Sequence, residues 1–101
     1  WLDIWLESHT QLAIDTQDTF LYVQDIVARA LGFDAPAYDA IVEEGFPAVA
    51  FGNTDAFFDA AGDPDKSARN QQLMRESCVR FIDYRTIDVV QTSQYVLKAL
   101  A

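Results

Sequence analysis

Helical periodicity dominates the first third of the chain. At about 100° per residue, residues 2–31 place an apolar set on one broad face and a polar set on another. The apolar set is Leu2, Trp5, Leu6, His9, Leu12, Ala13, Thr16, Phe20, Val23, Val27, Ala30 and Leu31. Gly32 can then supply the left-handed residue that ends many helices. The pattern predicts one long N-terminal helix, although a capping box that begins at Ser8 leaves open a separate first segment.

Proline, glycine and capping residues divide the middle of the chain. A capping carboxylate and a first-turn proline predict a short helix over 35–44, which a following glycine and proline stop. Asn53 or Thr54 can cap a second short helix that runs through Ala61. Residues 46–52 lie between these helices as a buried connector or a single extended segment, and the pattern does not decide between the two.

Roughly helical spacing of apolar residues continues through the C-terminal third. Asp63 and Pro64 form a helix start, and we expect this helix to reach about residue 84. A bend near 85–86 would then lead to a last helix that ends near residue 99. Residues 79–90 also contain β-branched residues that suit a strand, so helix and strand both remain open there.

These patterns together predict an all-α fold. We expect a small helical bundle with a long N-terminal helix, two short middle helices and a C-terminal helical pair. The 101 residues suffice for one hydrophobic core, so residues 1–101 are interpreted as a single acidic helical domain. Because the chain begins at Trp1 rather than at methionine, we expect a fragment, a processed form or a chain with further disordered flanks, and the sequence does not decide among them.

Charge is unevenly divided along the chain, whose formal net charge is −9. Residues 1–65 hold thirteen of the sixteen acidic side chains and one base, Arg29, which gives them a formal charge of −12. Residues 66–101 hold three acids and six bases, which gives +3. Such an acidic chain is a poor ligand for nucleic-acid phosphates or an anionic membrane. A cationic protein surface is a better match for the N-terminal part.

Cysteine usage and hydropathy indicate a cytoplasmic protein. Cys78 is the only cysteine, so no disulfide can form within the chain. No apolar run reaches the length of a membrane span, and the first residues lack the basic and then apolar layout of a signal peptide.

Residues capable of catalysis or metal binding are sparse. His9, the only histidine, falls on the apolar face of the first helix, so we expect a structural histidine rather than a general base. A dyad of His9 with Cys78 lacks a local sequence signature. The aspartates between residues 55 and 65 lack the alternating oxygen ligands and closing glutamate of an EF-hand loop. We therefore expect no enzyme activity, no metal and no cofactor.

Apolar residues also interrupt the polar side of the first helix. Ile4, Ile14 and Leu21 lie there, and Trp1 and Trp5 extend the apolar surface. Coverage on a second side is most simply provided by another copy of the chain, because symmetric dimers are the commonest soluble oligomers. The sequence therefore predicts a small non-enzymatic protein-interaction module that forms a homodimer through its N-terminal helix.

Two other functions remain open. The first is an acidic inhibitor or immunity-type protein that imitates phosphates and binds a basic protein surface. Its acidic stripe is Asp3, Glu7, Asp15, Asp18 and Asp25. The second is a small-molecule binder built around His9 and an aromatic cluster in the middle of the chain. That cluster is Phe33, Tyr38, Phe46, Phe51, Phe57 and Phe58.

Overall fold

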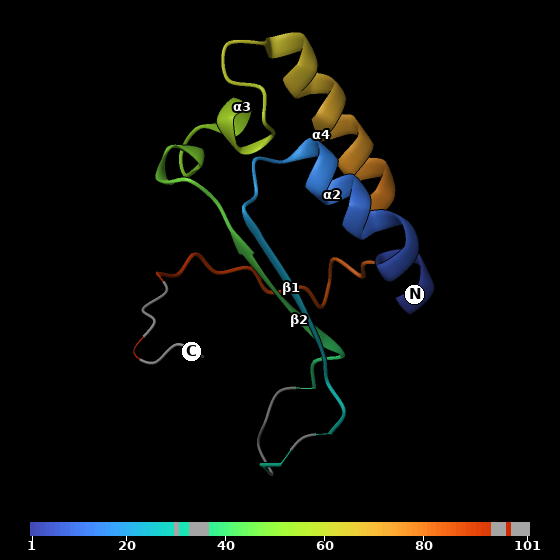
Figure 1. Cartoon of the computed structure of the whole chain (residues 1–101). Helices are drawn as coiled ribbons and strands as arrows, with labels where there is room; N and C mark the ends of the chain where they lie inside the picture. The colour runs from blue at the N-terminus through green and yellow to red at the C-terminus, as the bar shows by residue number, and fades with distance from the viewer. Residues whose placement is uncertain (30, 33–36, 94–96, 98–101) are drawn as a thin grey trace.

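The computed structural model describes residues 1–29, 31–32, 37–93 and 97 (Figure 1). Helical segments lie at the N-terminus and in the second half of the chain, and an antiparallel pair of strands lies between them. The fold is therefore mixed α and β, and the predicted all-α bundle is wrong.

The N-terminal helix is continuous but short. It consists of α1 (Leu2–Ile4), a π-helical segment η1 (Trp5–His9) and α2 (Thr10–Thr16). Gln17 has extended backbone angles and ends the helix, whereas the periodicity predicted a helix through residue 31. The next residues bond to other segments instead, since the Asp18 amide donates to the Phe57 carbonyl at 3.0 Å.

Strands β1 (Leu21–Ile26) and β2 (Ala40–Gly45) form a two-stranded antiparallel sheet. Leu21 lies opposite Gly45, and Ile26 lies opposite Ala40. The predicted helix over 35–44 is thus wrong over all of its described residues, 37–44, and its first two residues lie outside the described residues. Pairing satisfies the backbone groups that each strand turns toward the other, and β-branched side chains suit the extended conformation.

Small side chains allow helix α2 and helix α4 (Pro64–Cys78) to pack closely, side by side in Figure 1. Ala13 on α2 is fully buried, and Ser67 on α4 is 1% exposed. Met74 on α4 is also buried. This helix pair forms the best-covered part of the molecule.

Side-chain caps begin two of the helices where the sequence indicates them. After the 3-10 turn η2 (Ala48–Ala50), Asn53 caps α3 (Thr54–Phe57) by accepting a hydrogen bond from the Ala56 amide at 3.1 Å. Asp63 caps α4 by accepting one from the Lys66 amide at 3.0 Å, and Pro64 is the first residue of that helix. Both predicted helix starts are confirmed, although α3 ends at Phe57 and not at Ala61.

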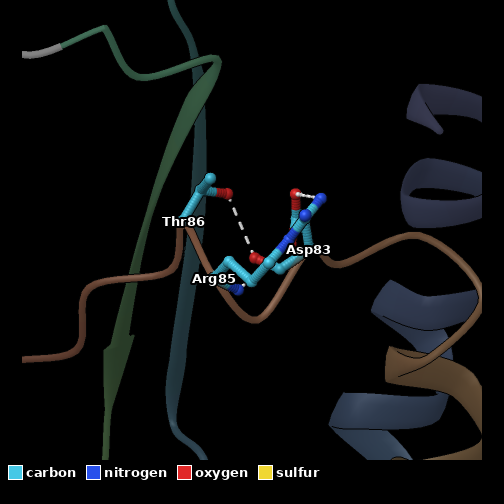
Figure 2. A network of polar contacts seen from close by, with 3 residues as sticks. All are labelled: Asp83, Arg85 and Thr86. Carbon is cyan, nitrogen blue, oxygen red and sulfur yellow. Dashed lines mark hydrogen bonds and ion pairs between the residues drawn. The ribbon is translucent and has the colours of Figure 1, made fainter.

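The segment after Cys78 is neither helix nor strand over residues 79–90. The prediction that α4 reaches residue 84 is wrong, and so is the predicted last helix over 86–93; residues 94–96 and 98–99 lie outside the described residues. Asp83 organises a tight turn in this segment, since its carboxylate accepts hydrogen bonds from the amide and the guanidinium of Arg85 (Figure 2). No helix among the described residues is both long and apolar enough to cross a membrane.

Candidate functional site

Two side-chain hydrogen bonds attach the hairpin to the N-terminal helix. The indole Nε1 of Trp5 donates to the hydroxyl of Tyr22 at 3.0 Å. Gln24 donates through Nε2 to the hydroxyl of Thr10 at 2.8 Å. Side chains two residues apart on a strand point to the same face of the sheet, so these bonds show which face of β1 is turned toward the helix.

The register then assigns every strand residue to a face, because residues directly opposite each other share one. The face toward the helix carries Tyr22, Gln24, Ile26, Ala40, Val42 and Glu44. The other face carries Leu21, Val23, Asp25, Ile41, Glu43 and Gly45. Each face therefore combines apolar side chains with at least one carboxylate.

The hairpin leaves a large part of its apolar surface uncovered. On the face toward the helix, Ile26 is 45% and Val42 is 44% exposed. On the other face, Ile41 is 50% exposed. A two-stranded sheet is marginally stable in water unless another element covers it. Contact with another element would therefore stabilise the end of the hairpin that carries Ile26, Ile41 and Val42.

Both outer edges of the sheet are open. The Val27 amide donates to the Asp39 carbonyl at 3.0 Å, which makes this pair a hydrogen-bonded one. Hydrogen-bonded and non-bonded pairs alternate along an antiparallel ladder, so the residues whose backbone groups point outward are Tyr22, Gln24, Ile26, Ala40, Val42 and Glu44. Within the described residues, these outward amides and carbonyls have no hydrogen-bond partner. Open edges of this kind are templates for an additional strand.

The surface is acidic. Asp25, Asp39 and Glu43 are exposed, and burial raises the pKa of Glu44. The two ion pairs among the described residues, Lys66 with Asp59 and Arg85 with Asp83, both lie elsewhere. No basic side chain in the described part of the chain forms an ion pair with the hairpin carboxylates. They are therefore available to pair with a basic side chain of another molecule.

An aromatic ring covers the end of the sheet at Gly45. The Phe20 amide donates to the Gly45 carbonyl at 2.9 Å. A Cβ placed on Gly45 would lie 2.7 Å from Cε2 of the Phe20 ring. Glycine thus allows the ring to lie directly on the strand, and the ring still remains 72% exposed.

His9 occupies a structural position. Its Nδ1 lies 2.8 Å from the Ser77 hydroxyl in a hydrogen bond, and its ring meets the edge of Phe81 with centroids 4.7 Å apart. The side chain is 5% exposed, and burial lowers its pKa. Burial also raises the pKa of the Cys78 thiol, which disfavours a reactive thiolate. Burial thus disfavours the charged form of His9, and its hydrogen bond with Ser77 joins η1 to α4.

The residues predicted to form a dimer contact are distributed over two elements. Trp1 is 53% exposed and its ring stacks on Trp5, whose own side chain is buried, with centroids 6.0 Å apart. Ile4 is half-buried and Ile14 is 45% exposed on the N-terminal helix. Leu21 belongs to β1, so it does not extend the helical surface.

The acidic stripe is similarly divided. Asp3, Glu7 and Asp15 are exposed on the N-terminal helix. Asp18 lies between helix and hairpin and lines a cavity of about 400 Å³ together with Asp59, Asp63 and Lys66. Asp25 is exposed on β1. The loss of the long helix thus separates the stripe into a helical part and a hairpin part.

The aromatic cluster forms around α3. Phe46 stacks on Phe57 with centroids 4.3 Å apart, and Phe51 and Phe58 contact the same pair. Phe57 and Phe58 also line a cavity of about 320 Å³. Tyr38 instead lies beside the hairpin, where its hydroxyl donates to Asp88, and Phe33 lies outside the described residues. The contacts of His9 are with Ser77 and Phe81, so the geometry does not unite this histidine with the cluster.

Neither a metal site nor a similar protein gives further information about the function. Among the described residues, no three His, Cys, Asp or Glu side chains are grouped so as to hold a metal ion. Comparison with protein-family models, curated proteins and solved structures found no match. The candidate site is therefore defined by the open hairpin alone. Residues 21–26 do not alternate apolar with polar side chains, and the aromatic and β-branched side chains of Tyr22, Val23 and Ile26 are the strand signal that the helical interpretation missed.

Proposed function

We propose that this chain is a small non-enzymatic protein-interaction module and that its hairpin is the contact surface. One observation carries the proposal: the hairpin combines unpaired strand edges in the described residues with exposed Ile26, Ile41 and Val42. Ile26 and Val42 lie on one face of the sheet and Ile41 lies on the other, so a strand added at an edge would meet exposed apolar side chains on both faces. His9 is the residue best suited to acid–base chemistry, and its buried position supports a structural role.

Site-specific photo-crosslinking tests this function. A photoreactive benzoylphenylalanine replaces Ile41 in one variant and Leu73 in another; the two side chains are 50% and 38% exposed, the first on the hairpin and the second on α4. In extracts of the source organism, we expect position 41 to give adducts of discrete mass that an excess of unmodified chain suppresses. Position 73 should give none. Equal labelling at both positions would contradict the proposal.

Self-association through the N-terminal helix is a second candidate, favoured by the exposure of Trp1 and Ile14. The test is the native mass measured by light scattering at low and high salt. An apolar dimer should persist at high salt, and Ile14→Glu should convert it to a monomer. An unchanged mass for this variant would exclude Ile14 from any dimer contact.

Binding to a basic protein surface is the remaining candidate. The exposed carboxylates of Asp3, Glu7 and Asp15 favour it, because none forms an ion pair within the described residues. Carboxylates of this kind speed association with a cationic partner, and salt weakens the effect. Affinity that does not change between low and high salt would argue against this function.

A further inference from the structure

We propose that the outer edge of β2 binds an extended segment of another protein as a third strand, and that this segment carries basic residues next to β-branched ones. The inference rests on the proposed function, for which it specifies the edge and the chemistry of the partner.

The outer edge of β2 carries open backbone groups. The amides and carbonyls of Ala40, Val42 and Glu44 point outward from β2 and have no partner within the described residues. The segment over residues 83–93 passes near the hairpin, where Asp88 accepts a hydrogen bond from Tyr38, but no backbone bond links it to β2 in the described part. Strand addition would satisfy these groups along the whole edge.

The distribution of carboxylates favours the outer edge of β2 over that of β1 as the binding edge. Glu43 and Glu44 lie on β2 and Asp39 immediately precedes it, whereas β1 carries Asp25 alone. A second copy of the chain pairing β2 with β2 would bring its own carboxylates to this edge, and like charges on adjacent strands are destabilising. A basic strand has the opposite effect. Charge complementarity therefore favours a cationic partner over self-pairing.

The register sets the order of the partner's side chains. Residues directly opposite each other on neighbouring strands share a face. Lys or Arg should lie opposite Glu43 and Glu44, and Val or Ile should lie opposite Ile41 and Val42. The partner sequence should thus contain two adjacent basic residues followed or preceded by two adjacent β-branched residues, according to the direction of the added strand.

A peptide titration followed by amide NMR tests the inference on the intact chain. The probe is acetyl-Thr-Lys-Lys-Val-Val-Thr-amide, together with its reversed sequence to cover both strand directions. We expect saturable shifts and slower hydrogen exchange at the outward amides of Val42 and Glu44, with affinity that falls as salt increases. Absence of saturable shifts with either peptide overturns the inference.

Two peptide controls separate backbone pairing from charge. N-methylation of the valines removes backbone donors and preserves charge, so this peptide should lose most of its affinity. Glu in place of both lysines preserves the backbone and reverses the charge, and it should lose most of its affinity as well. Unchanged binding of the methylated peptide refutes strand addition, and unchanged binding of the acidic one refutes a basic partner.

Matched proline variants test the choice of edge. Val42→Pro removes an outward donor from β2, and Ile26→Pro removes one from β1, so neither removes a bond between the two strands. We expect the first to lose about tenfold in affinity, the equivalent of one hydrogen bond, and the second to bind normally. If Val42→Pro does not fold, the double variant Glu43→Gln with Glu44→Gln should bind several-fold more weakly and with less dependence on salt. Equal losses in both proline variants, or unchanged binding in the glutamine variant, overturn the assignment to β2.

Two further results would distinguish this inference from the proposed function. A free protein that is already a dimer, with a protected Val42 amide, would show that a second copy occupies the edge. Failed peptide binding together with crosslinks specific to position 41 would refute the basic third strand and leave the hairpin as the contact surface. Failure of those crosslinks would instead remove the proposed function itself.

Discussion

Trp5 and Tyr22 form one of the two side-chain hydrogen bonds that attach the hairpin to the N-terminal helix, with the indole Nε1 donating to the phenolic oxygen at 3.0 Å. Trp5 is 5% exposed, so its N–H has little access to water. The bond is formed at the end of the hairpin near Gly45, since Tyr22 lies opposite Glu44. It therefore holds one end of the sheet and leaves the other uncovered.

Tyr22→Phe should destabilise the fold by about 1–2 kcal/mol, because it leaves a buried indole donor without its acceptor. Urea unfolding of the two proteins measures this difference. Tyr38→Phe is the matched control, since its hydroxyl bonds to Asp88 between exposed residues, and its loss should be small. Equal effects of the two substitutions would contradict the importance of the Trp5 bond.

Stability should fall as the pH decreases below about 6.5, the ordinary pKa of histidine. Burial lowers the pKa of His9 in the folded protein, so the unfolded chain takes up this proton first as the pH falls. The stability that His9 contributes is present above its unfolded pKa and is lost as the pH falls through its folded pKa. Chemical unfolding between pH 7 and 5.5 measures the slope, and His9→Asn should reduce it. The raised pKa of Glu44 acts with the opposite sign, so it cannot produce this loss.

Asp63→Ala should cost about 1 kcal/mol, because the Asp63 carboxylate accepts from the Lys66 amide at the start of α4. Thermal or urea unfolding provides the measurement. Asp65→Ala is the matched control in the first turn of the same helix; it removes a favourable charge but no cap. A larger loss for Asp65→Ala would show that charge, rather than capping, stabilises this helix end.

Arg85→Gln should raise the pKa of Asp83 toward its ordinary value. In the native chain, hydrogen bonds from the Arg85 side chain and, to a lesser extent, from the Arg85 backbone amide lower the pKa of Asp83. A lowered carboxyl pKa contributes stability above the unfolded value that is lost as the pH falls through the folded value. Carboxyl NMR titration gives the pKa directly, with Lys66→Gln as a control that should leave it unchanged. An Asp83 pKa insensitive to Arg85→Gln would contradict the turn in Figure 2.

Local sequence determined the starts of α3 and α4. The side chains of Asn53 and Asp63 each accept from an amide three residues later, so the capping bonds form within one short segment. Such bonds need no distant partner, which is why the printed sequence suffices to predict them. The acidic character of the N-terminal part is likewise a property of composition alone.

Tertiary structure decided the rest. Residues 21–26 fit a helical spacing and do not alternate apolar with polar side chains. Their pairing with residues 40–45 decided for a strand, because the inward backbone groups of each strand are bonded only across the sheet. The bond between His9 and Ser77 spans 68 positions, so no local pattern could indicate it. The open edges of the hairpin follow from the same pairing. Two strands bond to each other, and their outer groups remain for a partner that sequence periodicity cannot reveal.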